Sequence, residues 1–402
     1  MRQFEGIFRP DTKYKAFFLS MMTFGLAYGL YKGVFDNYLA EMVSMSAFDK
    51  GVSEFFRELP GLALIFILAM LYTMSAEKIY KIGALFSLVG MAAHAIIPAN
   101  RVLVILPIFI YSLGEHIQLG MKNTLSLEYS TEGHGGSALG IQNAVYQMGT
   151  LAGYIIVILI FAVFDSSLGL FRSVFWLSAA VIFLGFLSSL QMSGHSETDK
   201  TKQRFYFRKK YQKYYMLELF YGARKQIFFT FGPYVLVLFY GANTMVISIL
   251  FAVSSVCCFF ASPAVGKIID HFGYRIVMIT DTLILVIVCF FYGFAHHIFP
   301  THIAFIICCV NYVLDSVISL ASMASNVYVQ DLSENEDEVR ATISTGVSVN
   351  HFITILIALC GGWIWKTLGI ETLFILSAVL GLCNSAYAST VKGERAEGNG
   401  RI

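Results

Sequence analysis

The chain has 402 residues, of which 57% are hydrophobic and only 13% are charged, with a formal net charge of +2. Soluble domains carry about 25% charged residues, so this composition excludes an ordinary soluble domain. Seven prolines and 15% aromatic residues also exclude a disordered or low-complexity chain. We therefore predict an all-α polytopic membrane protein.

Long apolar runs follow one another along the whole chain. A membrane-spanning helix needs about 20 apolar residues. The first run follows a basic N-terminus, but it is too long for a signal peptide and no A-x-A cleavage site follows it, so we expect it to remain as a spanning helix. Twelve runs are predicted to span: 16–42, 54–75, 79–98, 102–127, 137–164, 169–192, 214–240, 244–268, 275–296, 301–328, 340–365 and 370–391.

The longest polar segment divides these runs six plus six. We predict an N-terminal bundle over 1–192, a cytoplasmic linker over 193–213 and a C-terminal bundle over 214–402. Of the 28 lysines and arginines, 19 fall on the side of the N-terminus and linker, five on the other side and four inside the membrane. Because cytoplasmic segments are enriched in these residues, we expect a multi-pass protein of the cytoplasmic membrane with both termini in the cytoplasm.

The two halves of the chain resemble each other. The stretch LAYGLYKG (26–33) aligns without a gap with LFYGARKQ (219–226), which places Lys225 opposite Lys32 and leaves Phe229 where Asp36 would stand. Internal repeats of this kind are typical of transporters built from related bundles. The sequence therefore predicts two pseudo-symmetric six-helix bundles.

A short loop carries the most specific motif. In GKIIDHFGYR (266–275), Gly266, Asp270, Gly273 and Arg275 fit the pattern G-x-x-x-D-x-x-G-[RK], and the chain thereby resembles the major facilitator superfamily. The resemblance implies secondary active transport by alternating access, with this loop as a cytoplasmic gate. We expect its glycines to allow a tight turn and close helix approach, and its Asp to cap a helix and pair with the Arg. A simple polar turn is the alternative.

Two departures from the family pattern affect what can be carried over. In the N-terminal copy of the loop (73–82), Glu77 replaces the Asp and Tyr80 replaces the second Gly, so we expect the stronger latch in the C-terminal half. The family also has an Arg four residues before a Gly in its fourth helix. Here His116 precedes Gly120, and the Arg-based role in proton coupling is not transferred.

Ionisable residues inside apolar runs point to the functional site. Each costs about 2.5–3.5 kcal/mol on insertion scales. One stands near the middle of each of the four segments that line the family's cavity, and Asp281 is the main exception elsewhere. We expect these four to converge at the membrane midplane, with purely structural pairing, such as a local Lys32–Asp36 pair, as the alternative. The four are Lys32, Glu115, Lys225 and Asp315.

The candidate site extends this set. We expect Glu115, His116 and Asp315 to be the groups that bind a coupling proton, and a slight excess of deep positive charge favours an anionic or zwitterionic metabolite. A multidrug or amphiphile efflux antiporter is an alternative, as is a non-transporting sensor or lipid-handling protein on the same scaffold. The candidate substrate and coupling residues are Lys32, Asp36, Glu115, His116, Lys122, Arg224, Lys225, Asn311 and Asp315.

Other features are expected to be structural. Gly25, Gly29 and Gly33, and likewise Gly149 and Gly153, form small-residue ridges typical of close helix packing. The seven cysteines lie in apolar runs and are expected to be buried thiols.

Several functional classes are not expected. The chain has no G-x-x-x-x-G-K-[ST] motif for ATP, and we expect no catalytic residues and no cofactor. His296, His297 and His302 lack a metal-ligand spacing, so no metal site is predicted. The expected partners are a small-molecule substrate, a proton and the lipid bilayer, without nucleic acid, and we expect a monomer.

Overall fold

The structure is a computed structural model that describes residues 6–71, 73–131, 134–192 and 207–391. These residues are almost entirely helical, and within them the only β-pairing is an isolated bridge between Phe8 and Ser130. The all-α prediction is confirmed. Most of the predicted linker, residues 193–206, lies outside the described residues.

The chain divides into two compact units. Unit 1 comprises residues 1–45, 56–202 and 243–252, and unit 2 comprises 46–55, 203–242 and 253–402. The start of the eighth helix therefore belongs to unit 1, where Ser248 Oγ donates a hydrogen bond to the Gly33 carbonyl at 3.0 Å. The start of the second helix belongs to unit 2.

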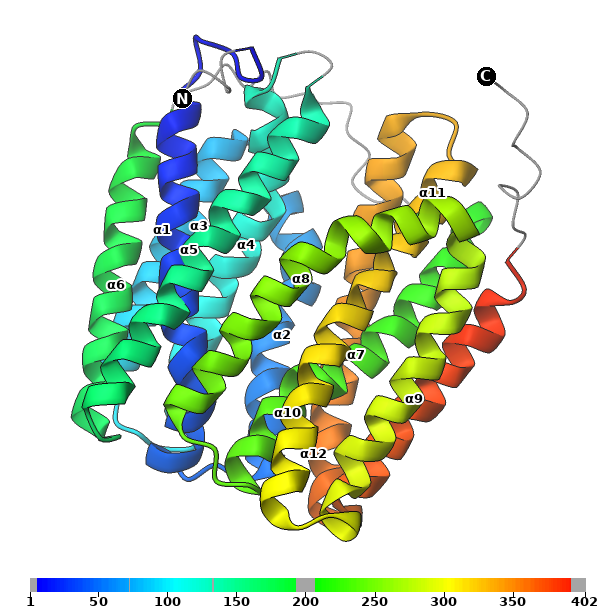
Figure 1. Cartoon of the computed structure of the whole chain (residues 1–402). Coiled ribbons are helices and arrows are strands. Elements are labelled where there is room, and N and C mark those ends of the chain that lie inside the picture. The colour runs from blue at the N-terminus through cyan, green and yellow to red at the C-terminus, as the bar shows by residue number, and fades with distance from the viewer. Residues whose placement is uncertain (1–5, 72, 132–133, 193–206, 392–402) are drawn as a thin grey trace. The chain divides into compact units, whose positions relative to one another are not determined.

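Unit 1 is built mainly from the first six spanning helices (Figure 1). Helix α1 packs against α5 and α6, while α3 packs against α4 and α6. A short π-helix, η2 (Tyr38–Met42), continues α1. The helices are α1 (Tyr14–Asn37), α2 (Ala47–Met70), α3 (Ala76–Ile96), α4 (Ile105–Tyr129), α5 (Gly135–Val163) and α6 (Leu168–Leu190).

Unit 2 holds most of the other six spanning segments. Helices α10, η4 and α11 follow one another without a break and count as one segment, whereas α12 bends at Gly369 (φ 89°) and counts as two. The elements are η3 (Lys209–Tyr211), α7 (Gln212–Leu238), α8 (Thr244–Phe272), α9 (Tyr274–Ile298), α10 (Thr301–Ile318), η4 (Ser319–Ser322), α11 (Met323–Leu332) and α12 (Glu336–Ala388).

The structure thus agrees with the twelve predicted segments. By length and composition alone, seven stretches of the described helices could cross a membrane, when α12 is counted as one stretch. The four that fall short are α1, α2, α4 and α7, and each carries charged residues in its interior. Three of these four, α1, α4 and α7, are among the segments expected to line a cavity.

Glycines bring α1 and α5 into backbone contact. A Cβ atom built on Gly25, Gly29, Gly149 or Gly153 would lie closer than 3.0 Å to a backbone atom of the facing helix. Only residues without a side chain permit this distance. The predicted packing ridge is confirmed, and it fixes the position of α1, which carries Lys32.

Candidate functional site

The charged pair of α1 is buried in unit 1. Lys32 Nζ lies 3.0 Å from Asp36 Oδ2, and the two residues are 8% and 1% exposed. The spacing of four residues places both side chains on one face of the helix. Lys32 Nζ also lies 5.2 Å from the ring centroid of Phe251 on the adjoining part of α8. The local pair that the sequence left as an alternative is therefore present.

We expect Asp36→Asn to lower the free energy of unfolding by about 2–3 kcal/mol, because Lys32 stays buried and loses its charged partner, although it keeps its other contacts. Thermal unfolding of the purified protein would measure the change. The double variant Lys32→Met/Asp36→Leu removes both charges and should be close to wild type in stability. A double variant less stable than Asp36→Asn would contradict this account.

A second group of unit 1 lies on α4. Glu115 and Lys122 are both half-buried, stand two turns apart on one helix face and interact electrostatically. Lys122 Nζ is 5.2 Å from the ring centroid of Tyr146, whose ring lies 6.2 Å from that of Tyr28. Carboxylate, ammonium and tyrosine rings are thus available together to bind a polar solute.

The structure separates His116 from Glu115. His116 is 5% exposed, and its Nδ1 lies 2.8 Å from the Ser112 carbonyl of its own helix. The Ser112 hydroxyl in turn donates to the Arg57 carbonyl of α2. Because successive helical residues point about 100° apart, His116 faces α2 while Glu115 points elsewhere. The two side chains do not form one proton site.

The central charged cluster of unit 2 surrounds Arg224 of α7. Arg224 is 1% exposed. Its Nη2 lies 3.2 Å from Asp281 Oδ2 on α9, and its Nη1 lies 4.0 Å from Asp315 Oδ1 on α10. Its Cζ lies 4.9 Å from the ring centroid of Tyr221. One guanidinium therefore lies between two buried carboxylates.

This cluster corrects the assignment made from the internal repeat. The repeat placed Lys225 opposite the buried Lys32, but Lys225 is exposed and its Nζ lies 5.9 Å from the Tyr221 ring centroid. Arg224, one residue earlier, is the buried basic group. Asp281 is a second correction, because sequence reasoning set it aside although an aspartate in an apolar run is itself a functional signal.

A third carboxylate of unit 2, Glu218, was missed altogether. It accepts hydrogen bonds from Ser325 Oγ at 2.8 Å and from Asn350 Nδ2 at 3.3 Å. Glu218 and Asp281 both line a small cavity of about 20 Å³, which is large enough for one water molecule. Asn311, a predicted site residue, instead donates to the Ile307 carbonyl of its own helix at 2.8 Å.

The loop motif adopts the predicted turn without the predicted ion pair. Gly273 has φ 80° and joins α8 directly to α9. Helix α8 continues to Phe272, which leaves Asp270 exposed, and Arg275 donates to the Ser389 carbonyl at 2.6 Å instead. A Cβ on Gly266 would meet no atom within 4 Å, so no close helix approach occurs there.

The altered N-terminal copy of the motif holds the more buried carboxylate. Glu77 is 4% exposed, and its Oε1 accepts a hydrogen bond from Tyr129 Oη of α4 at 3.3 Å. The corresponding Asp270 is exposed. The motif carboxylate that is hydrogen-bonded to another helix is therefore the one in unit 1. This is contrary to the expectation of a stronger latch in the C-terminal half.

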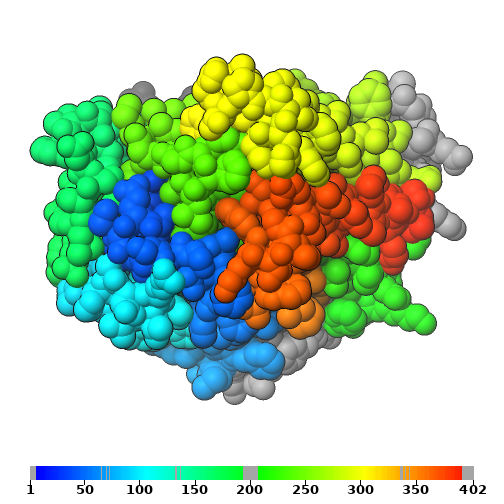
Figure 2. Space-filling view, turned by 90° about the horizontal axis from the view of Figure 1, so that it is seen from below, coloured from blue at the N-terminus to red at the C-terminus, as the bar shows by residue number. Residues whose placement is uncertain are grey.

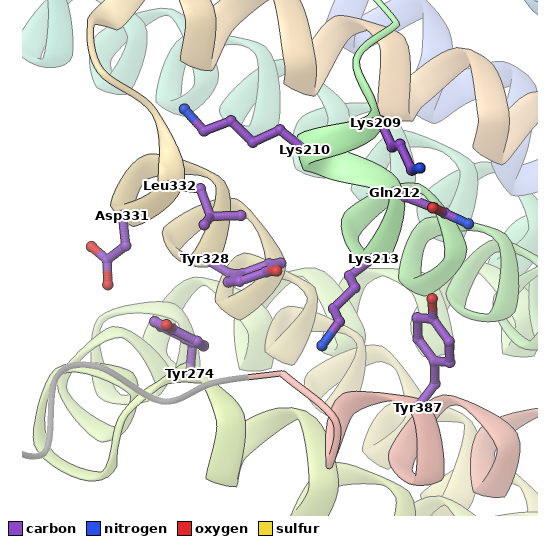
Figure 3. A pocket seen from close by; sticks show the side chains of 9 residues that line it. All are labelled: Lys209, Lys210, Gln212, Lys213, Tyr274, Tyr328, Asp331, Leu332 and Tyr387. Carbon is purple, nitrogen blue, oxygen red and sulfur yellow. The ribbon is translucent and has the colours of Figure 1, made fainter.

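A larger pocket of about 440 Å³ lies at the end of unit 2 that carries the loop motif, and Tyr274 of that motif lines it. Figure 3 shows Lys213 reaching into it between Tyr328 and Tyr387. Loss of hydration lowers the pKa of Lys210, but the Tyr211 hydroxyl and the carboxylates of Glu334 and Glu338 outweigh it and raise the pKa. Through Lys210, the segment before α7 contacts the acidic loop before α12, where the Asn335 side chain caps α12 by accepting a hydrogen bond from the Glu338 backbone N–H.

The fold and the buried charges define the class of protein: a multi-pass helical membrane protein with ionisable groups on its predicted lining helices. The family model described as Major Facilitator Superfamily matches residues 214–400. The C-terminal half of the chain is therefore similar to this superfamily. None of the curated proteins matches the chain.

Solved structures of several transporters share the fold of this chain. A mutant form of the nucleoside transporter NupG has 18% identity and a TM-score of 0.74, covering 94% of this chain and 100% of its own. A D-xylose-proton symporter has 14% identity and a TM-score of 0.72, covering 94% and 98%. A bacterial homologue of the iron transporter ferroportin has 11% identity and a TM-score of 0.71, covering 94% and 99%.

Proposed function

We propose that the chain is a proton-coupled secondary transporter of a small polar organic solute that is uncharged or zwitterionic. It acts by alternating access as a monomer in the cytoplasmic membrane, with both termini in the cytoplasm. The observation that carries the proposal is the pairing of the deep basic side chains with carboxylates of their own unit. Lys32 pairs with Asp36, Lys122 interacts with Glu115, and Arg224 with two aspartates.

Pairing changes the charge balance on which the substrate class depends. The sequence favoured an anionic or zwitterionic solute because basic groups outnumbered acidic ones. With the two carboxylates added by the structure, the count is five acidic groups to four basic ones, and the excess of positive charge disappears. The acidic groups are Asp36, Glu115, Glu218, Asp281 and Asp315, and the basic groups are Lys32, Lys122, Arg224 and Lys225.

Aromatic hydroxyls supply the remaining contacts. In unit 1, Tyr146 lies beside Lys122 and Tyr28 lies beside Tyr146, and in unit 2 Tyr221 lies beside Arg224. Such groups can stack on a ring and exchange hydrogen bonds with hydroxyl or amide groups. Two proteins of the same fold are named for a nucleoside and for D-xylose, which are uncharged polar solutes. This agrees with the proposal.

The substrate class can be tested by thermal shift on the purified full chain. The panel would contain nucleosides, pentoses, amino acids, dicarboxylates and tetraphenylphosphonium. We expect stabilisation by members of the first three groups. Stabilisation by dicarboxylates alone would restore the anionic assignment, and stabilisation by tetraphenylphosphonium alone would favour the multidrug alternative.

Unit 2 is the better candidate for the coupling proton. Around Arg224 and Lys225 stand Glu218, Asp281 and Asp315, so the set has a net charge of −1 when every group is ionised. Burying an uncompensated charge is costly, and a bound proton removes it. A proton on one of these carboxylates would neutralise the cluster, and its release would restore the charge.

We expect Asp315→Asn and Asp281→Asn to abolish the stimulation of uptake by a pH gradient in proteoliposomes loaded with a stabilising solute. Glu334→Gln, on an acidic-loop carboxylate whose side chain is 85% exposed, serves as the matched control and should keep full stimulation. If Glu115→Gln abolished stimulation while both aspartate variants kept it, the coupling proton would belong to unit 1.

A further inference from the structure

Two histidines and a glutamate meet at the end of unit 2 away from the loop motif. His296 and His297 lie in the last turn of α9, whereas the motif leads into its first turn, and Glu371 follows the bend of α12. His296 Nε2 and His297 Nε2 lie 3.3 Å and 2.9 Å from the same atom, Glu371 Oε1. Figure 2 shows the connection after α9, in yellow, beside the orange-red part of α12.

We propose that His296, His297 and Glu371 bind a divalent transition metal ion of the zinc class. One donor atom from each residue lies within 4.8 Å of the other two. In a tetrahedral zinc site with bonds of about 2.0–2.1 Å, neighbouring donors are about 3.3 Å apart. The two nitrogen–oxygen distances are close to that spacing, so small side-chain movements suffice to admit the ion.

The surrounding backbone and side chains hold this arrangement. Gly369 turns the chain with φ 89°, and a Cβ there would lie 2.5 Å from Glu371 Oε2, so glycine leaves room for the carboxylate. The His296 ring packs edge-on against Phe239 with centroids 4.8 Å apart. The His297 side chain is 57% exposed, which leaves the remaining coordination position to water.

The donor set also selects the metal. Two imidazole nitrogens with one carboxylate oxygen suit zinc, nickel, copper or iron, whereas calcium and magnesium prefer oxygen ligands alone. Imidazole binds metal only when neutral, so protons compete with the ion at acidic pH. The ion would join the end of α9 to α12, and the site is independent of the solute and of the coupling proton.

The test is a zinc titration of the full chain in detergent, purified with a tag that contains no histidine. Binding would be followed by competition with a chelating dye at pH 7.5 and at pH 5.5. We expect saturable binding at pH 7.5, weaker binding at pH 5.5, and at least tenfold weaker binding in His297→Ala and in Glu371→Gln. His302→Ala changes an exposed histidine outside the cluster and should bind zinc as the wild type does.

Two further measurements identify the zinc ligands and test whether the variant is folded. X-ray absorption of the zinc-loaded protein should show two imidazole nitrogens and oxygen at about 2.0–2.1 Å. Without zinc, His297→Ala should unfold at the wild-type temperature, which separates ligand loss from misfolding. Absence of saturable binding to the wild type, or equal zinc affinity in the wild type, His297→Ala and Glu371→Gln, would overturn the proposal.

Discussion

Arg224→Met should lower the free energy of unfolding by about 3–5 kcal/mol, the usual cost of removing one partner from a buried ion pair. Asp281 and Asp315 are 8% and 6% exposed, and both would lose the guanidinium that lies between them. We expect a sharp fall in the yield of folded protein and in its unfolding temperature. Thermal and denaturant unfolding in detergent would measure the loss.

Two companion variants separate charge compensation from packing. Lys225→Met changes the exposed neighbour of Arg224 and should stay within about 0.5 kcal/mol of wild type. The double variant Arg224→Met/Asp281→Asn removes one of the two uncompensated charges and should recover part of the lost stability. Additive losses in the double variant would show that Arg224 acts mainly through its packing.

The elements were predictable because spanning a membrane fixes their length. Each apolar run had to contain about 20 residues, and the twelve runs agree with the twelve helical segments. Apolar runs that contained charged residues could also be recognised as candidates for the functional site, since charges inside a membrane require a function or a partner. Length and composition therefore sufficed for the fold.

The rotation of each helix was not predictable to one residue. Arg224 and Lys225 are adjacent, so a step of about 100° decides which is buried, and the repeat alignment selected the wrong one. The contacts of Asp281 and Glu218 depend on how α7, α9 and α12 pack against one another. No single segment of the sequence contains this information. The same holds for Glu371, which lies 74 residues after His297.

Motif spacing predicted backbone better than side-chain contacts. The glycines of the loop predicted a tight turn, and Gly273 makes this turn with a positive φ. Whether Asp270 reaches Arg275 depends on where α8 ends, and α8 ends only at Phe272. The expected convergence of charged residues from the two halves at the membrane midplane stays a prediction.

Gly29→Leu should destabilise the protein by about 3 kcal/mol or more, at the upper end of what overpacking costs. Even a Cβ atom on Gly29 would lie closer than 3.0 Å to the Thr150 carbonyl of α5. That carbonyl belongs to the helix backbone and cannot rotate away, so α1 and α5 must separate along the whole ridge. Because α1 carries Lys32 and Asp36, transport should fall together with stability.

The matched control for this packing effect is Gly140→Leu in α5, where a Cβ would meet no atom within 4 Å. It should leave the unfolding temperature close to that of the wild type. Gly29→Ala should fall between the control and Gly29→Leu, since its single methyl group already displaces the facing backbone. Equal unfolding temperatures for Gly29→Leu and Gly140→Leu would mean that the ridge does not hold α1 against α5.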